Sequence, residues 1–175
     1  MRITNLQTNH FSQPLGWDFS YLHFSWEFTD SAQKTDLYTR IRIFKNNFSP
    51  SNLVFDSQPL CSWHQPFYEP DFVPEACTRY YWQVEIALSD GQNIFSEPTW
   101  FETARRKGDW PARWLTAYTT DHSMPFVFRS FTIDKPVSSA RLYAYGLGLY
   151  EASLNGEKIG EEYLSPGYHS YDFRN

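Results

Sequence analysis

The chain has 175 residues, 19% of them aromatic, with a formal net charge of −5 and a pI near 5.5. This length fits one large domain or two small ones, and the aromatic bias favours an all-β protein because aromatic side chains pack well on pleated sheets. The acidic balance argues against nucleic-acid binding, and no apolar run is long enough to predict a membrane span.

The first hundred residues predict short antiparallel strands. Apolar side chains alternate with polar ones over Leu22–Phe28, Leu37–Ile43 and Tyr80–Leu88, and this period of two is typical of half-buried strands. A turn at 89–92 leads into a last strand over Ile94–Phe101. Short alternating strands of this kind indicate a sandwich that buries one face of each sheet. We therefore predict a fibronectin type III-like or immunoglobulin-like β-sandwich over residues 1–104.

Two details support this prediction. Trp26 lies in an early strand, where a buried tryptophan is common in such sandwiches. Thr78-Arg79-Tyr80 resembles a tyrosine corner, in which the phenol hydroxyl forms a hydrogen bond to nearby backbone.

The alternation stops at Ala104, and residues 105–114 are predicted to be a linker. The basic run Arg105-Arg106-Lys107 is interpreted as a solvated part of this linker rather than as a binding patch. Trp110 and Trp114 follow it. We expect them to pack in a core or between modules; stacking on a sugar is the alternative.

Residues 115–175 predict a second, partial β-sandwich of jelly-roll type. Asn155-Gly156 fixes one tight hairpin, because these residues readily adopt the positive φ that a two-residue loop requires. Gly146 and Gly148 are interpreted as a bend or a close backbone approach. The four candidate strands are Phe126–Ile133, Ala140–Tyr145, Leu149–Leu154 and Glu157–Ile159. A jelly roll normally has eight strands, so we expect this module to be incomplete and its unpaired edges to favour self-association.

The sequence predicts no catalytic residue, metal site or cofactor, and it identifies no substrate-binding residue. Glu161, Glu162 and Asp121 are interpreted as solvated carboxylates, and Ser165 as a turn residue. Cys61 and Cys77 are expected to be free thiols, with a disulfide as the alternative in an oxidising compartment. The histidines have no metal-ligand spacing; they are His10, His23, His64, His122 and His169.

Several segments, taken in order, resemble the N-terminal region of bacterial α-L-rhamnosidases of glycoside hydrolase family 78. They are Pro14-Leu15-Gly16, Phe24-Ser25-Trp26, Val54-Phe55-Asp56-Ser57, the stretch from Thr78 to Val84, Ser96-Glu97-Pro98, Trp100-Phe101-Glu102-Thr103, Phe128-Arg129-Ser130-Phe131 and the stretch from Tyr143 to Tyr171. This resemblance implies an inverting hydrolase that releases terminal α-L-rhamnose from glycosides. It places the catalytic (α/α)6 barrel beyond these residues, so we expect a fragment of a larger enzyme, inactive by itself.

Two other classes of function remain open. The second module could bind carbohydrate through exposed aromatic residues; the candidates are Tyr145, Tyr150, Tyr163, Tyr168 and Tyr171. Alternatively, the chain could be a stand-alone interaction protein on a fibronectin-like scaffold. The N-terminal residues contain no apolar signal segment, which favours a cytoplasmic location.

Overall fold

A computed structural model describes residues 2–29, 36–60, 66–88, 91–106, 108–116, 118, 124–163 and 165. The chain divides into two compact units, Met1–Trp114 and Leu115–Asn175. Within the described ranges the secondary structure is all β apart from one 3₁₀ turn, Pro50–Asn52. Nowhere in these ranges is there a helix with the length and apolar character that a bilayer crossing requires.

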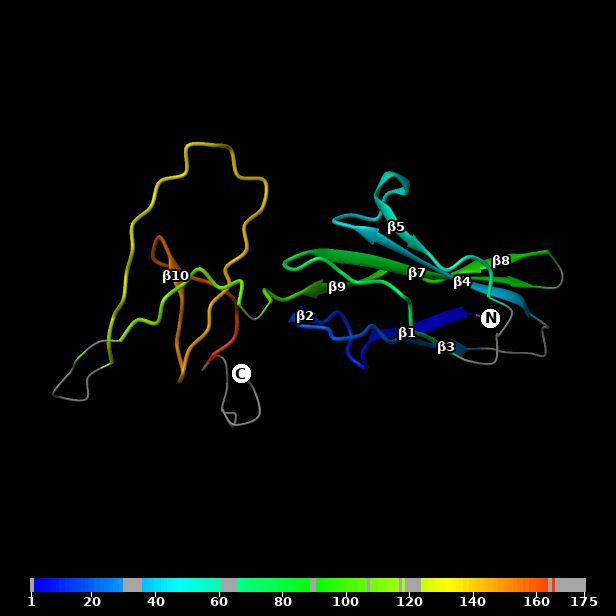
Figure 1. The fold of residues 1–175 in the computed structure, drawn as a ribbon, viewed down its shortest axis with the longest axis horizontal. Coiled ribbons are helices and arrows are strands. Elements are labelled where there is room, and N and C mark those ends of the chain that lie inside the picture. The colour runs from blue at the N-terminus through cyan, green and yellow to red at the C-terminus, as the bar shows by residue number, and fades with distance from the viewer. Residues whose placement is uncertain are drawn as a thin grey trace. The chain divides into compact units, whose positions relative to one another are not determined.

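The described residues of the first unit form two β-sheets, and most of their strands are labelled in Figure 1. The smaller sheet is antiparallel with the order β1-β3-β6, formed by β1 (Arg2–Thr8), β3 (Phe24–Thr29) and β6 (Phe67–Tyr68). The larger sheet has the order β2-β9-β7-β4-β5, with β8 also paired to β7. Its strands are β2 (Leu15–Trp17), β4 (Asp36–Lys45), β5 (Leu53–Asp56), β7 (Arg79–Leu88), β8 (Asn93–Phe95) and β9 (Thr99–Thr103). This unit has the predicted immunoglobulin-like arrangement.

The core of the first unit is aromatic and lies on the inward positions of the alternating strands. Trp82 is fully buried, its ring is stacked 4.3 Å from that of Phe24, and its Nε1 donates a hydrogen bond to Thr8 Oγ1 at 3.1 Å. Tyr80 and Phe101 stack at 5.3 Å beside this pair. These contacts join residues far apart in the sequence. The remaining buried members of the cluster are Ile3, Leu22, Trp26, Ile41, Ile43, Val84, Ile86 and Leu88.

The predicted tyrosine corner is present at the start of β7. The backbone N–H of Glu75 donates to the Tyr80 hydroxyl oxygen at 2.9 Å. Because the Tyr80 ring is buried, this hydrogen bond fixes the position of the loop before β7 against the core. Burial of this hydroxyl raises the pKa of Tyr80. Trp26 is buried as expected, with 3% of its surface exposed.

Ion pairs cover the outward face of the larger sheet. Arg40 Nε donates to Asp56 Oδ1 at 2.8 Å, and this hydrogen bond is the main cause of the lowered pKa of Asp56. Arg79 Nε donates to Glu102 Oε2 at 2.9 Å, and its guanidinium lies 4.1 Å above the ring of Trp100. These pairs satisfy charges on neighbouring strands, as cross-strand partners do in other sheets.

One strand prediction in this unit is wrong. The run Ile94–Phe101 is two strands, β8 and β9, separated by Ser96-Glu97-Pro98. Ser96 is buried there; its hydroxyl accepts the N–H of Val84 at 3.1 Å, and its own N–H donates to the Val84 carbonyl at 2.9 Å. Pro98 has no N–H with which to continue a ladder. The strand is therefore interrupted for two reasons: the Ser96 side chain accepts a hydrogen bond from the neighbouring strand, and Pro98 lacks a backbone N–H donor.

The second unit contains one hairpin in its described residues, formed by β10 (Ser153–Leu154) and β11 (Glu157–Lys158). Its loop confirms the prediction, because Asn155 and Gly156 have φ of 52° and 86°. Tyr150 pairs with Ser165 in an isolated bridge. Gly146 marks a close approach, since a Cβ at this position would lie 2.7 Å from Cδ1 of Tyr150.

The predicted strands Phe126–Ile133 and Ala140–Tyr145 are wrong, because neither range forms a ladder with any described residue. A strand requires a hydrogen-bonded neighbour in addition to an alternating pattern. Apolar side chains in these ranges are largely exposed, Phe126 to 90% and Phe128 to 80%. None of the described residues of the second unit is buried.

Candidate functional site

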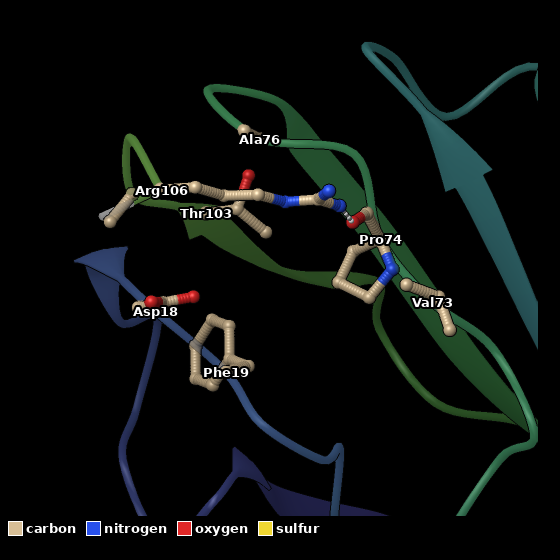
Figure 2. A pocket seen from close by; sticks show the side chains of 8 residues that line it. Asp18, Phe19, Val73, Pro74, Ala76, Thr103 and Arg106 are labelled. Carbon is tan, nitrogen blue, oxygen red and sulfur yellow. Dashed lines mark hydrogen bonds between the residues drawn. The ribbon is translucent and has the colours of Figure 1, made fainter. Parts of the chain in front are cut away.

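A hollow in the described residues of the first unit lies where the chain leaves β9. It has a volume of about 200 Å³. Figure 2 shows Arg106 extending toward Pro74, with Asp18 and Phe19 on the opposite side. The lining comes from three segments: residues after β2, the loop before β7, and the end of β9. Its members are Asp18, Phe19, Val73, Pro74, Ala76, Thr103, Ala104 and Arg106.

Backbone hydrogen bonds hold two of these segments together. β2 runs parallel to β9, and the N–H of Ala104 donates to the Trp17 carbonyl at 2.7 Å. Gly16 has φ of +72°, a left-handed conformation that glycine adopts without steric cost. Gly16 lies inside β2, where the pairing with β9 shifts register between Leu15 and Trp17, and Asp18 and Phe19 follow directly at one wall of the pocket. Phe19 is anchored by an edge-on contact with Phe101, with ring centroids 5.6 Å apart.

The third segment is fixed by Thr103. Its hydroxyl donates to the Glu75 carbonyl at 2.6 Å and accepts the N–H of Thr78 at 2.9 Å. The N–H of Cys77 donates to the Ala104 carbonyl at 3.1 Å. The hydrogen-bonding capacity of Thr103 is thus used within the protein, and its role in the pocket wall is structural.

Two charged side chains that line the pocket, Arg106 and Asp18, have hydrogen-bonding groups that no described residue occupies. Arg106 Nη2 donates to the Pro74 carbonyl at 3.2 Å, which occupies one of the five guanidinium N–H donors. The carboxylate of Asp18 has neither an ion-pair nor a hydrogen-bond partner among the described residues. One acceptor and one donor group are therefore available beside an apolar wall formed by Phe19, Val73 and Pro74.

The basic run makes contacts that the sequence did not indicate. Arg106 is exposed, as expected for a solvated position, and its Nη2 donates to the Pro74 carbonyl, 32 residues earlier; Arg105 Nη1 donates to the Asp109 carbonyl at 3.0 Å. Lys107 lies outside the described residues. Spacing in the sequence could not reveal this contact, because it depends on how the loop before β7 packs against the end of β9.

The acidic candidates from the sequence do not form a catalytic arrangement in the described residues. Glu161 and Glu162 are exposed on a bend, and Glu162 Oε2 accepts a hydrogen bond from Ser165 at 3.3 Å. Asp121 lies outside the described residues.

His23 has a contact that the sequence did not predict. Its Nδ1 lies 3.1 Å from Glu69 Oε1, and its ring is 5.1 Å from that of His10. Where the structure describes the chain, no group of three or more His, Cys, Asp or Glu residues could hold a metal ion. The other histidines, His64, His122 and His169, lie outside the described residues.

Cys77 is an exposed free thiol, whereas Cys61 lies outside the described residues. Trp110 and Trp114 are 39% and 67% exposed, so the expectation that they belong to a core is wrong. Their packing between modules stays a prediction.

Of the tyrosines proposed to bind sugar, Tyr145 and Tyr163 are 45% and 80% exposed, and Tyr150 is half-buried. Lys158 Nζ lies 3.4 Å from the ring centroid of Tyr163 and covers one of its faces. Tyr168 and Tyr171 lie outside the described residues.

Comparison with known proteins gives the same assignment for both parts of the chain. Residues 3–107 match the family described as "Rha78A-like, N-terminal immunoglobulin domain", and residues 135–175 match "Alpha-L-rhamnosidase N-terminal domain". An α-L-rhamnosidase of Formosa agariphila is 30% identical over 124 residues, covering 56% of this chain and 13% of that protein. One from Alteromonas sp. is 26% identical, covering 94% of this chain and 20% of its own length.

A solved structure supports the fold. The crystal structure of Streptomyces avermitilis α-L-rhamnosidase complexed with L-rhamnose matches 67% of this chain and 12% of that chain, with 27% identity and a TM-score of 0.54. The chain spans about an eighth to a fifth of the length of these relatives. It belongs to the family of Rha78A-like N-terminal immunoglobulin domains and continues into sequence of the α-L-rhamnosidase N-terminal domain.

Proposed function

We propose that this chain is the non-catalytic N-terminal region of an α-L-rhamnosidase. The parent enzyme would release terminal α-L-rhamnose from glycosides with inversion, on an (α/α)6 barrel outside these residues. The two β modules would support that barrel. We assign residues 1–104 to the immunoglobulin-like module, 105–114 to the linker with its aromatic segment, and 115–175 to the rhamnosidase N-terminal domain.

The observation that carries this proposal is the order of the two family matches. An immunoglobulin-like domain over residues 3–107 precedes an α-L-rhamnosidase N-terminal domain over 135–175. The curated relatives that span nearly the whole chain are α-L-rhamnosidases.

The disposition of acidic residues supports a non-catalytic role. Inverting glycosidases hold two carboxylates about 6.5–9.5 Å apart, one as general acid and the other as base for the attacking water. In the described second unit Glu161 and Glu162 are adjacent and exposed. Both side chains face solvent rather than a closed site.

A turnover assay tests this proposal. Purified chain incubated with 4-nitrophenyl α-L-rhamnopyranoside is expected to release no nitrophenol above the rate without protein. A full-length rhamnosidase, assayed alongside, controls for the substrate and the conditions. Saturable release by the chain itself, retained through successive purification steps, would contradict the assignment of a non-catalytic role.

The exposed rings of Tyr145 and Tyr163 favour a second candidate, a carbohydrate-binding module in the second unit. Exposed aromatic faces can stack against sugar rings. Calorimetric titration with L-rhamnose would detect such binding. In this case Tyr145→Ala and Tyr163→Ala should each weaken it; unchanged heats in both variants would reject this candidate.

A further inference from the structure

We propose that the pocket formed by Asp18, Phe19, Val73, Pro74 and Arg106 binds a 6-deoxyhexose of the L-rhamnose type, an inference that rests on the proposed function. All residues that line the pocket belong to the first unit, whereas the tyrosines considered above belong to the second. It would allow the immunoglobulin-like module to retain a rhamnosylated substrate or a released sugar.

The polar side of the pocket matches the hydroxyl groups of a sugar. A hydroxyl both donates and accepts hydrogen bonds, so different hydroxyls of one sugar ring can donate to a carboxylate and accept from a guanidinium. Asp18 supplies an acceptor that has no partner among the described residues, and Arg106 supplies donors beyond the one bound to Pro74. Hydrogen bonds to ionised groups are about twice as strong as neutral ones.

The apolar side matches the part of a deoxysugar that has no hydroxyl. Phe19, Val73 and Pro74 line the same hollow, and Val73 is 79% exposed. A 6-deoxyhexose carries a methyl group where its parent hexose carries a hydroxymethyl group. Covering this methyl and the adjacent ring carbons removes apolar surface of both partners from water.

The walls are preformed, which favours binding of a small ligand because little ordering is required. Phe19 packs edge-on against Phe101, and Thr103 hydrogen-bonds to both Glu75 and Thr78. The Arg106 side chain extends from the segment after β9 to the loop before β7, where its Nη2 donates to the Pro74 carbonyl, as Figure 2 shows.

Nuclear magnetic resonance titration of the ¹⁵N-labelled 175-residue chain with millimolar L-rhamnose tests this site. We expect saturable shifts at the amides of Phe19, Thr103 and Arg106. L-Mannose, which differs only by the hydroxyl on C6, should bind about tenfold more weakly. Asp18→Asn should lower the affinity for L-rhamnose about tenfold, whereas the control Asp71→Asn on an exposed loop residue should leave it unchanged.

The inference would be overturned by no shift at these amides, by equal affinity for the two sugars, or by shifts confined to the second unit. Stronger shifts with free L-valine than with L-rhamnose would also overturn it, since they would indicate a site for zwitterions. None of these results would contradict the proposed non-catalytic role. That role is tested separately, and hydrolysis of the aryl rhamnoside by the chain itself would contradict it.

Discussion

The two units contain similar apolar side chains but use them differently. In the first unit Trp82, Phe24 and Phe101 are fully buried between two sheets. In the second, Phe126 and Phe128 are 90% and 80% exposed, although their rings lie 6.3 Å apart on an alternating segment. An alternating pattern therefore forms a stable layer only where a second layer covers it, because burial supplies the main driving force for folding.

Strand pairing shows the same difference. β7 is hydrogen-bonded along both edges, to β4 on one side and to β8 and β9 on the other. In the second unit β10 and β11 pair over two residues each. An isolated hairpin is marginally stable in water. We accordingly expect substitutions to have global effects in the first unit and local effects in the second.

The largest expected difference comes from truncating an aromatic side chain in each unit. Trp82→Ala should lower the free energy of unfolding of the first unit by about 3–5 kcal/mol, because it leaves a cavity beside Phe24. The control, Phe128→Ala, removes an exposed ring and should change this free energy by less than about 0.5 kcal/mol. Urea unfolding followed by circular dichroism measures both. Equal losses would contradict the contrast between the units.

Tyr80→Phe should lower the stability of the first unit by about 1 kcal/mol. The substitution keeps the ring but removes the acceptor of the Glu75 N–H. In the unmodified chain the raised pKa of Tyr80 contributes stability below pH about 10, which is lost as the pH rises through the folded value. Unfolding at neutral and alkaline pH should show a smaller alkaline loss in the variant; an unchanged alkaline loss would exclude this role.

Asn155→Ala should depopulate the hairpin of the second unit at a cost of about 1 kcal/mol, because alanine is strained at the positive φ of this position. The stability of the first unit should not change. Amide chemical shifts of Ser153 and Lys158 report the hairpin. A matched loss in the unfolding of the first unit would show that the two units fold cooperatively.

The smallest effect concerns the pair Arg40–Asp56. The pKa of Asp56 is lowered by its hydrogen bond from Arg40, so the pair contributes stability above pH about 4 that is lost as the pH falls through the folded value. This contribution is at most about 1 kcal/mol because the pair is partly exposed. Asp56→Asn should remove that part of the acid dependence, and a double-mutant cycle with Arg40→Gln isolates it.

Much of the first unit could be predicted from sequence because its signals are local and agree with one another. Alternation predicted β3, β4 and β7, and a short motif predicted the tyrosine corner. In the second unit the Asn155-Gly156 turn was likewise predicted from a short motif. The break at Ser96 was missed because it depends on a hydrogen bond to the neighbouring strand at Val84.

The pocket could not be predicted because its walls come from distant segments. Asp18 and Arg106 are 88 positions apart, and each carries an ordinary charged side chain in a loop. Their proximity follows from the parallel pairing of β2 with β9, which no local pattern indicates. The wrong strand predictions over Phe126–Ile133 and Ala140–Tyr145 have a related cause. A strand needs a paired neighbour, and a local sequence pattern does not specify which segment that neighbour is.

Hydrogen exchange of the 175-residue chain, followed by mass spectrometry, tests most directly the claim that the first unit is a self-supporting module whereas the described residues of the second unit form no buried core. We predict that amides of β4, β7 and β9 exchange slowest, with protection approaching the global free energy of unfolding, and that residues 126–145 exchange close to the rate of unstructured peptide. Protection of residues 126–145 equal to that of β7 would contradict this account.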